Sequence, residues 1–420
     1  MCSDMVLKPM DTSERDIVVA TAASVHSDSG LALREIARSL GMDRAGKPDF
    51  VTLHHGSARS VAALFPEAMK TFGTAALHGA SSCLGVMTQH GVAFGKGDAM
   101  GAFAVWDPEG AYGTAMSTIG ADPVADAAAT IRKALARAGR PGEAPDLVWL
   151  TATPGEEEAI LRGIKSVIGA SALILGASAA DNTVAGRWSV FSSDGVAEAG
   201  MVISVLFPSV PFGSCFESGY VSTELHGTVT AAEGRRLLRI DDRPAAEVFS
   251  EWTSGTILPP GTGSRSILSE ATLSPLGRKQ MEIGGIPVHC LLHPAIAHSD
   301  GSLDLFAEPE VGEKLWLMQG SYENLVQRAG RIAASSRAQI DTAPVAGALV
   351  VYCGGCMLAV RERMDEVAES IAQSLGGAPF LGVFSFGEQG EMPAGEAVHG
   401  NLMISCAAFG SRPSSRSRRQ

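Results

Sequence analysis

The sequence predicts a mixed α/β fold with two domains built from repeated β-α-β-β units. A chain of 420 residues, 45% hydrophobic and 19% charged, is long and apolar enough for more than one core. Its 48 glycines follow no collagen-like period and indicate many tight turns between short elements. The third observation is that one order of strands, turns and helices occurs three times along the chain.

Each repeat begins with a short apolar run that has the length and composition of a buried strand. The three runs are FVTLHH at 50–55, LVWLTAT at 147–153 and ALVVYC at 348–353. A turn of small residues follows each run, at 56–57, 154–155 and 354–355. This composition predicts a strand that turns directly into a helix.

Helical patterns follow the turns at 59–72, 156–168 and 361–375. Pro66 interrupts the first pattern and weakens it. The second carries acidic residues in its first turn and a lysine near its end, which suits the helix dipole. The third places Met364, Val367, Ile371 and Leu375 at helical spacing and stops at two glycines.

Two further strands complete each repeat. The second strand leads into a glycine-containing polar loop, at 76–85, 173–182 and 379–390. The third strand lies at 99–106, 200–207 and 400–409. Because strand, helix and turn signals agree in all three places, the repetition indicates shared architecture.

The segment between the second and third repeats has another pattern. It reads as two strands and a helix at 229–252, a loop at 254–266, and two strands at 301–321. An amphipathic helix at 322–339 leads into the third repeat. We therefore expect domains at 15–215 and 222–410, and a disordered basic tail at 411–420.

The composition argues against several classes of protein. A net charge of −12 repels phosphate backbones and argues against a nucleic-acid binder. The sequence shows neither an apolar signal core nor a run long enough to span a membrane. Seven scattered cysteines do not form a disulfide framework. We expect a cytoplasmic protein with reduced thiols.

The pair Cys353 and Cys356 has the spacing of a redox dithiol or half a zinc site. The pair lies in the strand-to-helix turn of the third repeat, and the other two repeats have no cysteine pair there. A zinc site would need a second pair or a paired histidine motif. We favour a tight turn over a reactive dithiol.

Five stretches identify a family resemblance. They are LHGASSCLGVM, LGASAAD, VTAAEG with IDDRPAAEVF, ALVVYCGGCM, and above all LGVFSFGEQGEMPAGEAVHGNLM. These resemble the FIST N and FIST C domains of bacterial signalling proteins and some eukaryotic F-box proteins. The resemblance covers about residues 15–410, and the motif from Gly387 to Asn401 is its most specific part.

The resemblance implies a sensory, ligand-binding protein rather than an enzyme. The family was proposed to bind amino acids and similar small ligands. One bacterial branch is similar to haem-binding nitric-oxide sensors that regulate histidine kinases or cyclic-di-GMP enzymes. That branch includes stand-alone chains, which is the format we expect here. Most of the family has an asparagine-glutamine pair after the last histidine, where this chain has His399-Gly400-Asn401.

The three glycine-containing loops predict where a ligand binds. Folded side by side, they bring three strand ends and helix N-termini together, which is where α/β sheets hold anionic ligands. The candidate ligand-binding residues are Ser81, Ser82, Asp181, Asn182, Cys353, Ser385, Glu388, Gln389, His399 and Asn401. For each residue the alternative is a structural hydrogen bond between loops.

A haem would need an axial histidine and an apolar slot. His293 and His399 rank first among the ten histidines as possible axial ligands. His289, His293 and His298 also cluster, but Pro294 argues against one helix that carries all three. For each single histidine, the alternative to haem ligation is a structural role.

Two other functions stay open at this point. In a thiol enzyme, Cys353 would be the nucleophile, His399 the base and Glu388 the residue that orients it. In a docking scaffold, the acidic surface and the basic tail would recruit partners without a small ligand. Sequence spacing does not show whether the three residues of the thiol enzyme meet.

Overall fold

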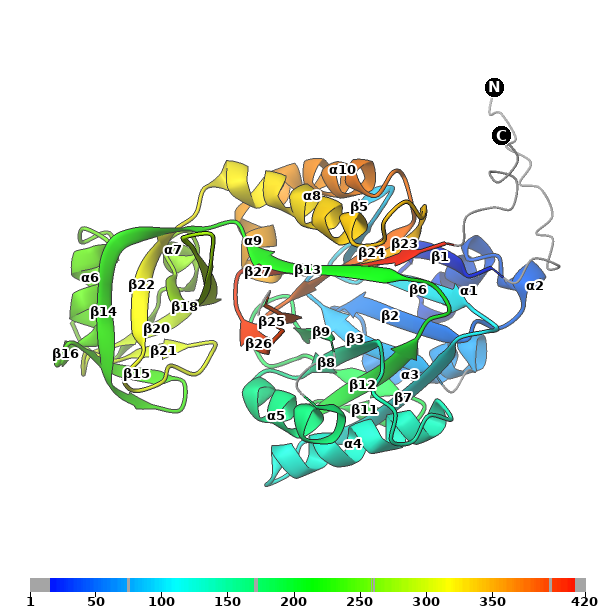
Figure 1. The fold of residues 1–420 in the computed structure, drawn as a ribbon, viewed down its shortest axis with the longest axis horizontal. Coiled ribbons are helices and arrows are strands. Elements are labelled where there is room, and N and C mark those ends of the chain that lie inside the picture. Colours follow the sequence, from blue (N-terminus) through cyan, green and yellow to red (C-terminus); the bar gives the residue numbers. More distant parts are fainter. Residues whose placement is uncertain are drawn as a thin grey trace.

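The computed structural model describes residues 16–73, 76–169, 173–257, 259, 261–392 and 395–411. The predicted basic tail lies outside these residues apart from Ser411. The described residues form three six-stranded sheets and one nine-stranded sheet. Figure 1 shows the nine-stranded sheet in a separate body on the left and the other three sheets on the right. The predicted mixed α/β fold is confirmed.

The three repeats predicted from the sequence are present, and each has a parallel strand pair at its centre. These pairs are β2 (Phe50–Gly56) with β3 (Leu77–Ser82), β8 (Leu147–Ala152) with β9 (Ile174–Ser178), and β23 (Val345–Cys353) with β24 (Phe380–Ser385). The third strands pair antiparallel with the first of each pair; they are β6 (Met100–Trp106), β12 (Gly200–Phe207) and β27 (Met403–Gly410).

Each repeat is larger at its N-terminal end than the sequence pattern predicted. An additional strand pairs with the third strand of each repeat: β1 (Val18–Ser24), β7 (Ala111–Thr118) and β13 (Phe212–Ser218). A helix follows each additional strand: α1 (Ser29–Ser39), α4 (Pro123–Arg137) and α8 (Tyr322–Ala338). The complete unit therefore reads β-α-β-α-β-hairpin-β.

The helices begin at capping side chains that the sequence supplies. Asp28, Asp122 and Ser321 each accept a backbone N–H from the first turn of the helix that follows. The predicted connecting helices are α3 (Val61–Phe72), α5 (Glu157–Ile168) and α10 (Met364–Ser374). Pro66 lies inside α3 without ending it. Shorter helices are α2 (Met42–Ala45), α9 (Gly354–Ala359) and η1 (Arg361–Arg363).

The hairpins of the three units are exchanged between sheets. The hairpin of the first unit, β4 (Val86–Thr88) and β5 (Gly91–Ala93), extends the sheet of the third. That of the second, β10 (Val190–Ser192) and β11 (Gly195–Ala197), extends the sheet of the first. That of the third, β25 (Glu388–Glu391) and β26 (Ala397–Gly400), extends the sheet of the second. The three units therefore interlock in a closed cycle.

A ring of three backbone hydrogen bonds joins the units where the hairpins leave their strands. Cys83 donates to Phe384 O (3.0 Å), Ala180 donates to Ser81 O (3.2 Å), and Phe386 donates to Ser178 O (3.2 Å). Each bond joins equivalent positions of two different units. The expectation that the three loops converge is confirmed.

The inner faces of the three sheets share one hydrophobic core. It contains Phe103 of β6, Trp149 of β8 and Phe409 of β27, all nearly inaccessible to solvent. The phenyl rings of Phe103 and Phe409 lie 5.7 Å apart, across two sheets. Helices α8 and α10 lie above this body and α4 and α5 below it (Figure 1).

A unit of its own, residues 221–319, is inserted between β13 and α8, and we call it the inserted unit. Its nine-stranded sheet holds the two predicted strands β14 (Val221–Glu233) and β15 (Arg236–Ile240), and α6 (Ala245–Trp252) covers it. The other elements are β16 (Arg243–Pro244), β17 (Ser264–Ser266), α7 (Leu268–Ala271), β18 (Leu276–Ile283), β19 (Ile286–Leu292), β20 (Pro294–His298), β21 (Leu303–Leu305) and β22 (Lys314–Gln319).

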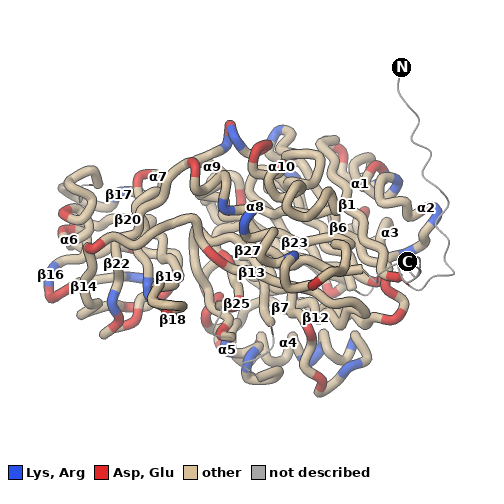
Figure 2. The backbone as a smooth tube through the Cα atoms, turned by 45° about the horizontal axis from the view of Figure 1, so that its top comes forward, with Lys and Arg blue, Asp and Glu red and all other residues tan. Residues whose placement is uncertain are grey.

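Basic and acidic residues occur in both bodies of the described part of the chain. In Figure 2, Lys and Arg alternate with Asp and Glu in both bodies, and neither body shows a single basic face in this view. No helix among the described residues combines the length and the apolar composition that crossing a membrane requires.

Candidate functional site

A buried carboxylate lies where the inserted unit meets the second repeat. Glu157 stands in the first turn of α5, and the residue is 1% exposed. Its Oε1 accepts the Ser178 hydroxyl at 2.6 Å, and its Oε2 accepts the Gly155 backbone N–H at 2.8 Å. A buried carboxylate must be compensated in this way, because removing a charge from water is costly.

Arg235 of the inserted unit supplies the positive charge. The Nη2 of Arg235 donates to Glu157 Oε2 at 2.6 Å and to Glu158 Oε2 at 2.7 Å. Burial alone would raise the pKa of Glu157, but the nearby His399 ring, the Arg235 guanidinium and the two hydrogen bonds lower it to about 2. The Arg235 Nε is buried and has no hydrogen-bond partner. Part of the guanidinium's hydrogen-bonding capacity is therefore unused.

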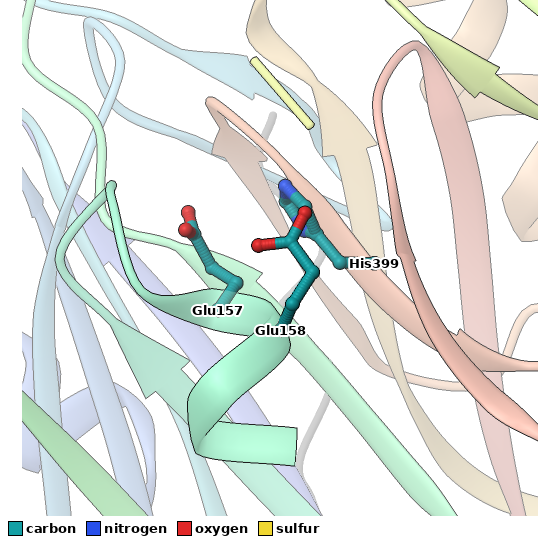
Figure 3. Close-up of side chains that lie close together, drawn as sticks. All are labelled: Glu157, Glu158 and His399. Atoms are coloured by element: carbon teal, nitrogen blue, oxygen red, sulfur yellow. The ribbon is translucent and has the colours of Figure 1, made fainter. Parts of the chain in front are cut away.

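His399 and Gln389 close this group from the hairpin β25–β26. Gln389 Nε2 donates to Ser178 Oγ and to His399 Nδ1, each at 3.1 Å. His399 Nε2 lies 3.2 Å from the Phe306 carbonyl, which can only accept, so the ring proton is on Nε2. Figure 3 shows His399 close to Glu158 and Glu157. We call Glu157, Glu158, Ser178, Arg235, Gln389 and His399 the Glu157 cluster.

The Glu157 cluster has side chains that could bind a metal ion, but a guanidinium group lies between its carboxylates. One ligand atom each of Glu157, Glu158 and His399 lie within 4.8 Å of one another. The guanidinium of Arg235 bridges the two carboxylates. It occupies the position of a cation and neutralises part of their charge. The arrangement is therefore an ion-pair network that fastens the inserted unit to the second repeat.

Glu388 lies on the opposite face of β25 from Gln389, because neighbouring residues of a strand point to opposite sides. Its carboxyl accepts the Ser385 hydroxyl at 2.5 Å and the Met403 N–H at 2.9 Å. Burial and the neighbouring Cys353 raise the pKa of Glu388 well above its ordinary value. The carboxyl is held in an apolar part of the core.

The structure brings Cys353 and Glu388 together, but the His399 ring lies with Gln389 on the other side of the strand. A hydrogen bond with Cys356 and burial raise the pKa of the Cys353 thiol well above its ordinary value. Cys353 stands at the N-cap position of α9, at the predicted strand-to-helix turn, and Cys356 is fully buried. The environment favours the neutral thiol.

Of the four candidate residues in the first two loops, three make hydrogen bonds between loops and Asp181 makes them within its own loop. Ser81 Oγ accepts from Ser189 N–H, and Ser82 Oγ accepts from Phe384 N–H. Asp181 accepts three backbone N–H groups of its own loop. Asn182 accepts from Leu84 N–H at 2.8 Å and donates to Gly97 O at 2.9 Å. Their polar atoms hold the convergent loops in place.

Asn401 and His293 pair at the base of the inserted unit. Asn401 Oδ1 accepts the His293 backbone N–H at 3.0 Å, and the His293 ring Nε2 lies 2.9 Å from Leu268 O. Burial lowers the pKa of His293 to about 4. The amide nitrogen of Asn401 is buried without a partner. Pro294 begins β20 and not a helix, so the spacing of the three neighbouring histidines has no helical meaning.

An open pocket of about 600 Å³ lies against the other face of β26. We call it the seam pocket; Arg278, Lys279, Gln280, Glu310, Glu313, Lys314, Trp316, Glu396 and Val398 line it. Val398 and His399 are neighbours on β26 and point to opposite sides of it. The inserted unit therefore contacts both faces of this strand, with the Glu157 cluster on one and the seam pocket on the other.

Sequence reasoning did not predict Glu157, Glu158 or Arg235. From the sequence, the acidic residues at 156–158 were interpreted only as favourable charges at the N-terminus of a helix dipole. Arg235 lies in a run of charged residues after a turn, where arginines commonly meet water. The two glutamates could have been recognised because the acidic first turn of a predicted helix directly follows a buried strand.

The fold and this site define an α/β protein of three interlocked units with a charged seam to an inserted unit. Residues 49–243 match the FIST N domain model and residues 245–391 match the FIST C domain model. The chain therefore belongs to the FIST family. FIST domains are generally sensory domains that bind small ligands in signalling proteins.

No curated protein matches the chain significantly. Among solved structures it is similar to the cyanuric acid hydrolase of A. caulinodans, with 11% identity, 94% of this chain and 99% of that chain covered, and a TM-score of 0.37. A second cyanuric acid hydrolase has 10% identity and a TM-score of 0.33, with 94% of this chain and 100% of that chain covered. PurLQS of Thermotoga maritima has 8% identity and a TM-score of 0.23, with 94% of this chain and 72% of that chain covered. These TM-scores carry no argument about fold or function.

Proposed function

We propose that this protein senses a small metabolite that carries both a positive and a negative group, such as an amino acid. The ligand binds in the seam pocket, between β26 and the inserted unit. One observation carries the proposal: three basic and three acidic side chains line one pocket of about 600 Å³ at the junction of two bodies. Ligand sites occur preferentially at such junctions.

The lining supports a zwitterion over a simple anion or cation. Lys314 can bind a carboxylate and Glu310 can bind an amine. Arg278 and Glu313 already pair with each other at 3.3 Å, and Lys279 pairs with Glu282 at 2.6 Å, so a ligand would share these groups with their present partners. Burial raises the pKa of Glu313, although the neighbouring Arg278 opposes this effect. Trp316 adds an aromatic surface for the apolar part of the ligand.

The ligand signals by changing how the inserted unit meets the hairpin β25–β26. A ligand shifts a conformational equilibrium by its difference in affinity for the two states. The Glu157 cluster contacts the opposite face of β26 through His399. The seam pocket and the Glu157 cluster therefore both lie at the junction between β26 and the inserted unit. The downstream partner of this proposal is a histidine kinase or a cyclic-di-GMP enzyme, acting in the cytoplasm.

A cytoplasmic location agrees with the state of the cysteines. The six cysteines of the described residues are Cys83, Cys215, Cys290, Cys353, Cys356 and Cys406, and all are free. Free, mostly buried thiols are typical of reducing compartments. This observation supports the location as part of the proposal.

Isothermal titration calorimetry with the twenty common amino acids tests the proposal. We expect saturable binding of at least one amino acid to the full chain, and at least about tenfold weaker binding to Lys314→Ala. Lys96→Ala is the matched control, because Lys96 is an exposed lysine of the first unit and lies outside the seam pocket. Equal loss in both variants, or no binding to the wild type, would contradict the proposal.

Haem-based nitric-oxide sensing is the second candidate, and it rests on the sequence resemblance. The two histidines ranked first would have to give up hydrogen bonds to bind a haem iron through Nε2. The rings of His293 and His399 already contact the carbonyls of Leu268 and Phe306, which a haem iron would displace. Adding haem to the purified protein tests this candidate: a Soret band that shifts with nitric oxide supports it, and no band removes it.

A thiol enzyme based on Cys353 is the third candidate. Its contact with Glu388 supports the candidate, and its raised pKa opposes it, because the thiolate is the reactive form. The reactivity of Cys353 towards an alkylating reagent separates this candidate from the sensor.

A further inference from the structure

A second pocket lies at the point where the chain enters the inserted unit. Its volume is about 410 Å³, and we call it the Tyr220 pocket. Its apolar walls come from the residue before β14, from β14 itself, from the hairpin β18–β19 and from β22; they are Tyr220, Val221, Ile283, Ile286, Pro287, Val288 and Met318. This pocket shares no lining residue with the seam pocket.

The apolar rim of the Tyr220 pocket is exposed to an unusual degree. Val221 is 58% exposed, Ile283 is 47% exposed, and Ile286 is 69% exposed. Single exposed apolar residues are normal, but a contiguous exposed group marks a binding surface. Here the group surrounds a cavity, so the occupant is a molecule with an apolar part that enters it.

Two nitrogen atoms among the pocket's lining residues have unused hydrogen-bonding capacity. His289 is 8% exposed, and its Nε2 is buried without a hydrogen-bond partner. The Nε of Arg328 is likewise buried without one, while its Nη2 is paired with Glu217. Buried polar nitrogens without partners are rare in proteins. A ligand oxygen that accepts from both would satisfy them.

The charges around the pocket favour an anionic head group. Arg328 is accompanied by Arg331. Lys279, which acts on the His289 ring from outside the lining, is already paired with Glu282 at 2.6 Å. Glu217 is the acidic residue of the lining and is already paired with Arg328. Arg331 therefore supplies the positive charge beyond these ion pairs, and it attracts a carboxylate and repels an amine.

We propose that the Tyr220 pocket binds an apolar carboxylic acid, such as a medium-chain fatty acid. The carboxylate accepts hydrogen bonds from His289 and Arg328, and the chain packs against Ile283, Ile286 and Val221. This site is separate from the seam pocket and does not depend on the proposed function. It places a second ligand at the chain segment that joins β13 of the third repeat to the inserted unit.

Calorimetry with three eight-carbon probes tests the head group. Octanoate, octanol and octylamine share one chain and differ in charge. We expect octanoate to bind the full-length protein at least about tenfold more tightly than octanol, and octylamine to bind more weakly still. Arg328→Gln should remove the preference for octanoate over octanol. Equal affinities of octanoate and octanol for the wild type would overturn the proposal.

A second pair of variants tests the location. Ile286→Asp places a charge on the exposed rim and should weaken octanoate binding at least tenfold. Val311→Asp is the matched control, because Val311 is 65% exposed in the same unit but does not line the pocket. Octanoate affinity that is unchanged in Ile286→Asp, or no octanoate binding to the wild type, would also overturn it.

Discussion

Arg235 Nη2 lies 2.6 Å from Glu157 Oε2, although the two residues belong to different bodies of the chain. Arg235 precedes a strand of the inserted unit, and Glu157 begins a helix of the second repeat. Because the carboxylate is almost wholly buried, it requires this partner. The ion pair therefore determines how the inserted unit is seated.

Arg235→Gln should destabilise the protein by about 3–5 kcal/mol, because it leaves the buried Glu157 carboxylate without its charge partner. Urea unfolding at pH 7.5 measures this change. Arg236→Gln is the matched control, since Arg236 pairs with Asp300 at the surface and should cost less than about 1 kcal/mol. Similar losses in the two variants would show that the Glu157 pair is unimportant.

Buried His293 should make part of the stability depend on pH. Its pKa is lowered by burial from 6.5 to about 4, so the folded protein binds fewer protons than the unfolded chain between these values. The stabilisation by neutral His293 is complete above pH 6.5 and is lost as the pH falls towards 4. The free-energy difference between the wild type and His293→Gln should shrink over this range in urea titrations. A difference that is equal at pH 8 and pH 5 would contradict the assignment.

Gly79 should be intolerant of any side chain. A Cβ atom there would lie 2.2 Å from the Phe191 ring of the exchanged strand β10. Gly79→Ala should therefore cost about 1–3 kcal/mol in urea unfolding, because the packed ring must move. Gly261→Ala, where a Cβ meets nothing within 4 Å, should change stability by less than about 0.5 kcal/mol. If Gly79→Ala is as harmless as Gly261→Ala, the close crossing of β3 and β10 is wrong.

Cys353 should react slowly with alkylating reagents in the native protein. It is 4% exposed, and its raised pKa keeps the thiol protonated at neutral pH. After brief iodoacetamide treatment at pH 7.5, peptide mass spectrometry should find Cys353 modified only in a urea-unfolded control. Rapid native modification would revive the thiol-enzyme candidate.

Local signals predicted the three repeats well. Apolar runs, small-residue turns and helical spacing located the parallel pairs and the helices that connect them, because these elements depend on neighbouring residues. Pro66 was the weakest point of the helical patterns, yet α3 continues through it. The additional strands β1, β7 and β13 were outside the repeat that the pattern defined.

The sequence pattern did not predict which distant strands pair with each other. Nothing near β4 indicates that it extends the sheet of β24, almost three hundred residues later. For the same reason Arg235 was not connected to Glu157. The convergence of Gln389 and His399 with Ser178 was partly foreseen, since two of these three residues were candidates. Their partners come from parts of the chain that only the fold brings together.

Hydrogen–deuterium exchange with and without the best-binding amino acid tests the central claim most directly. We predict that the ligand protects residues 278–280, 310–316 and 396–398, which line the seam pocket, more than any other described segment. Protection at the convergent loops 81–83 and 178–180, without change at the seam pocket, would contradict the account.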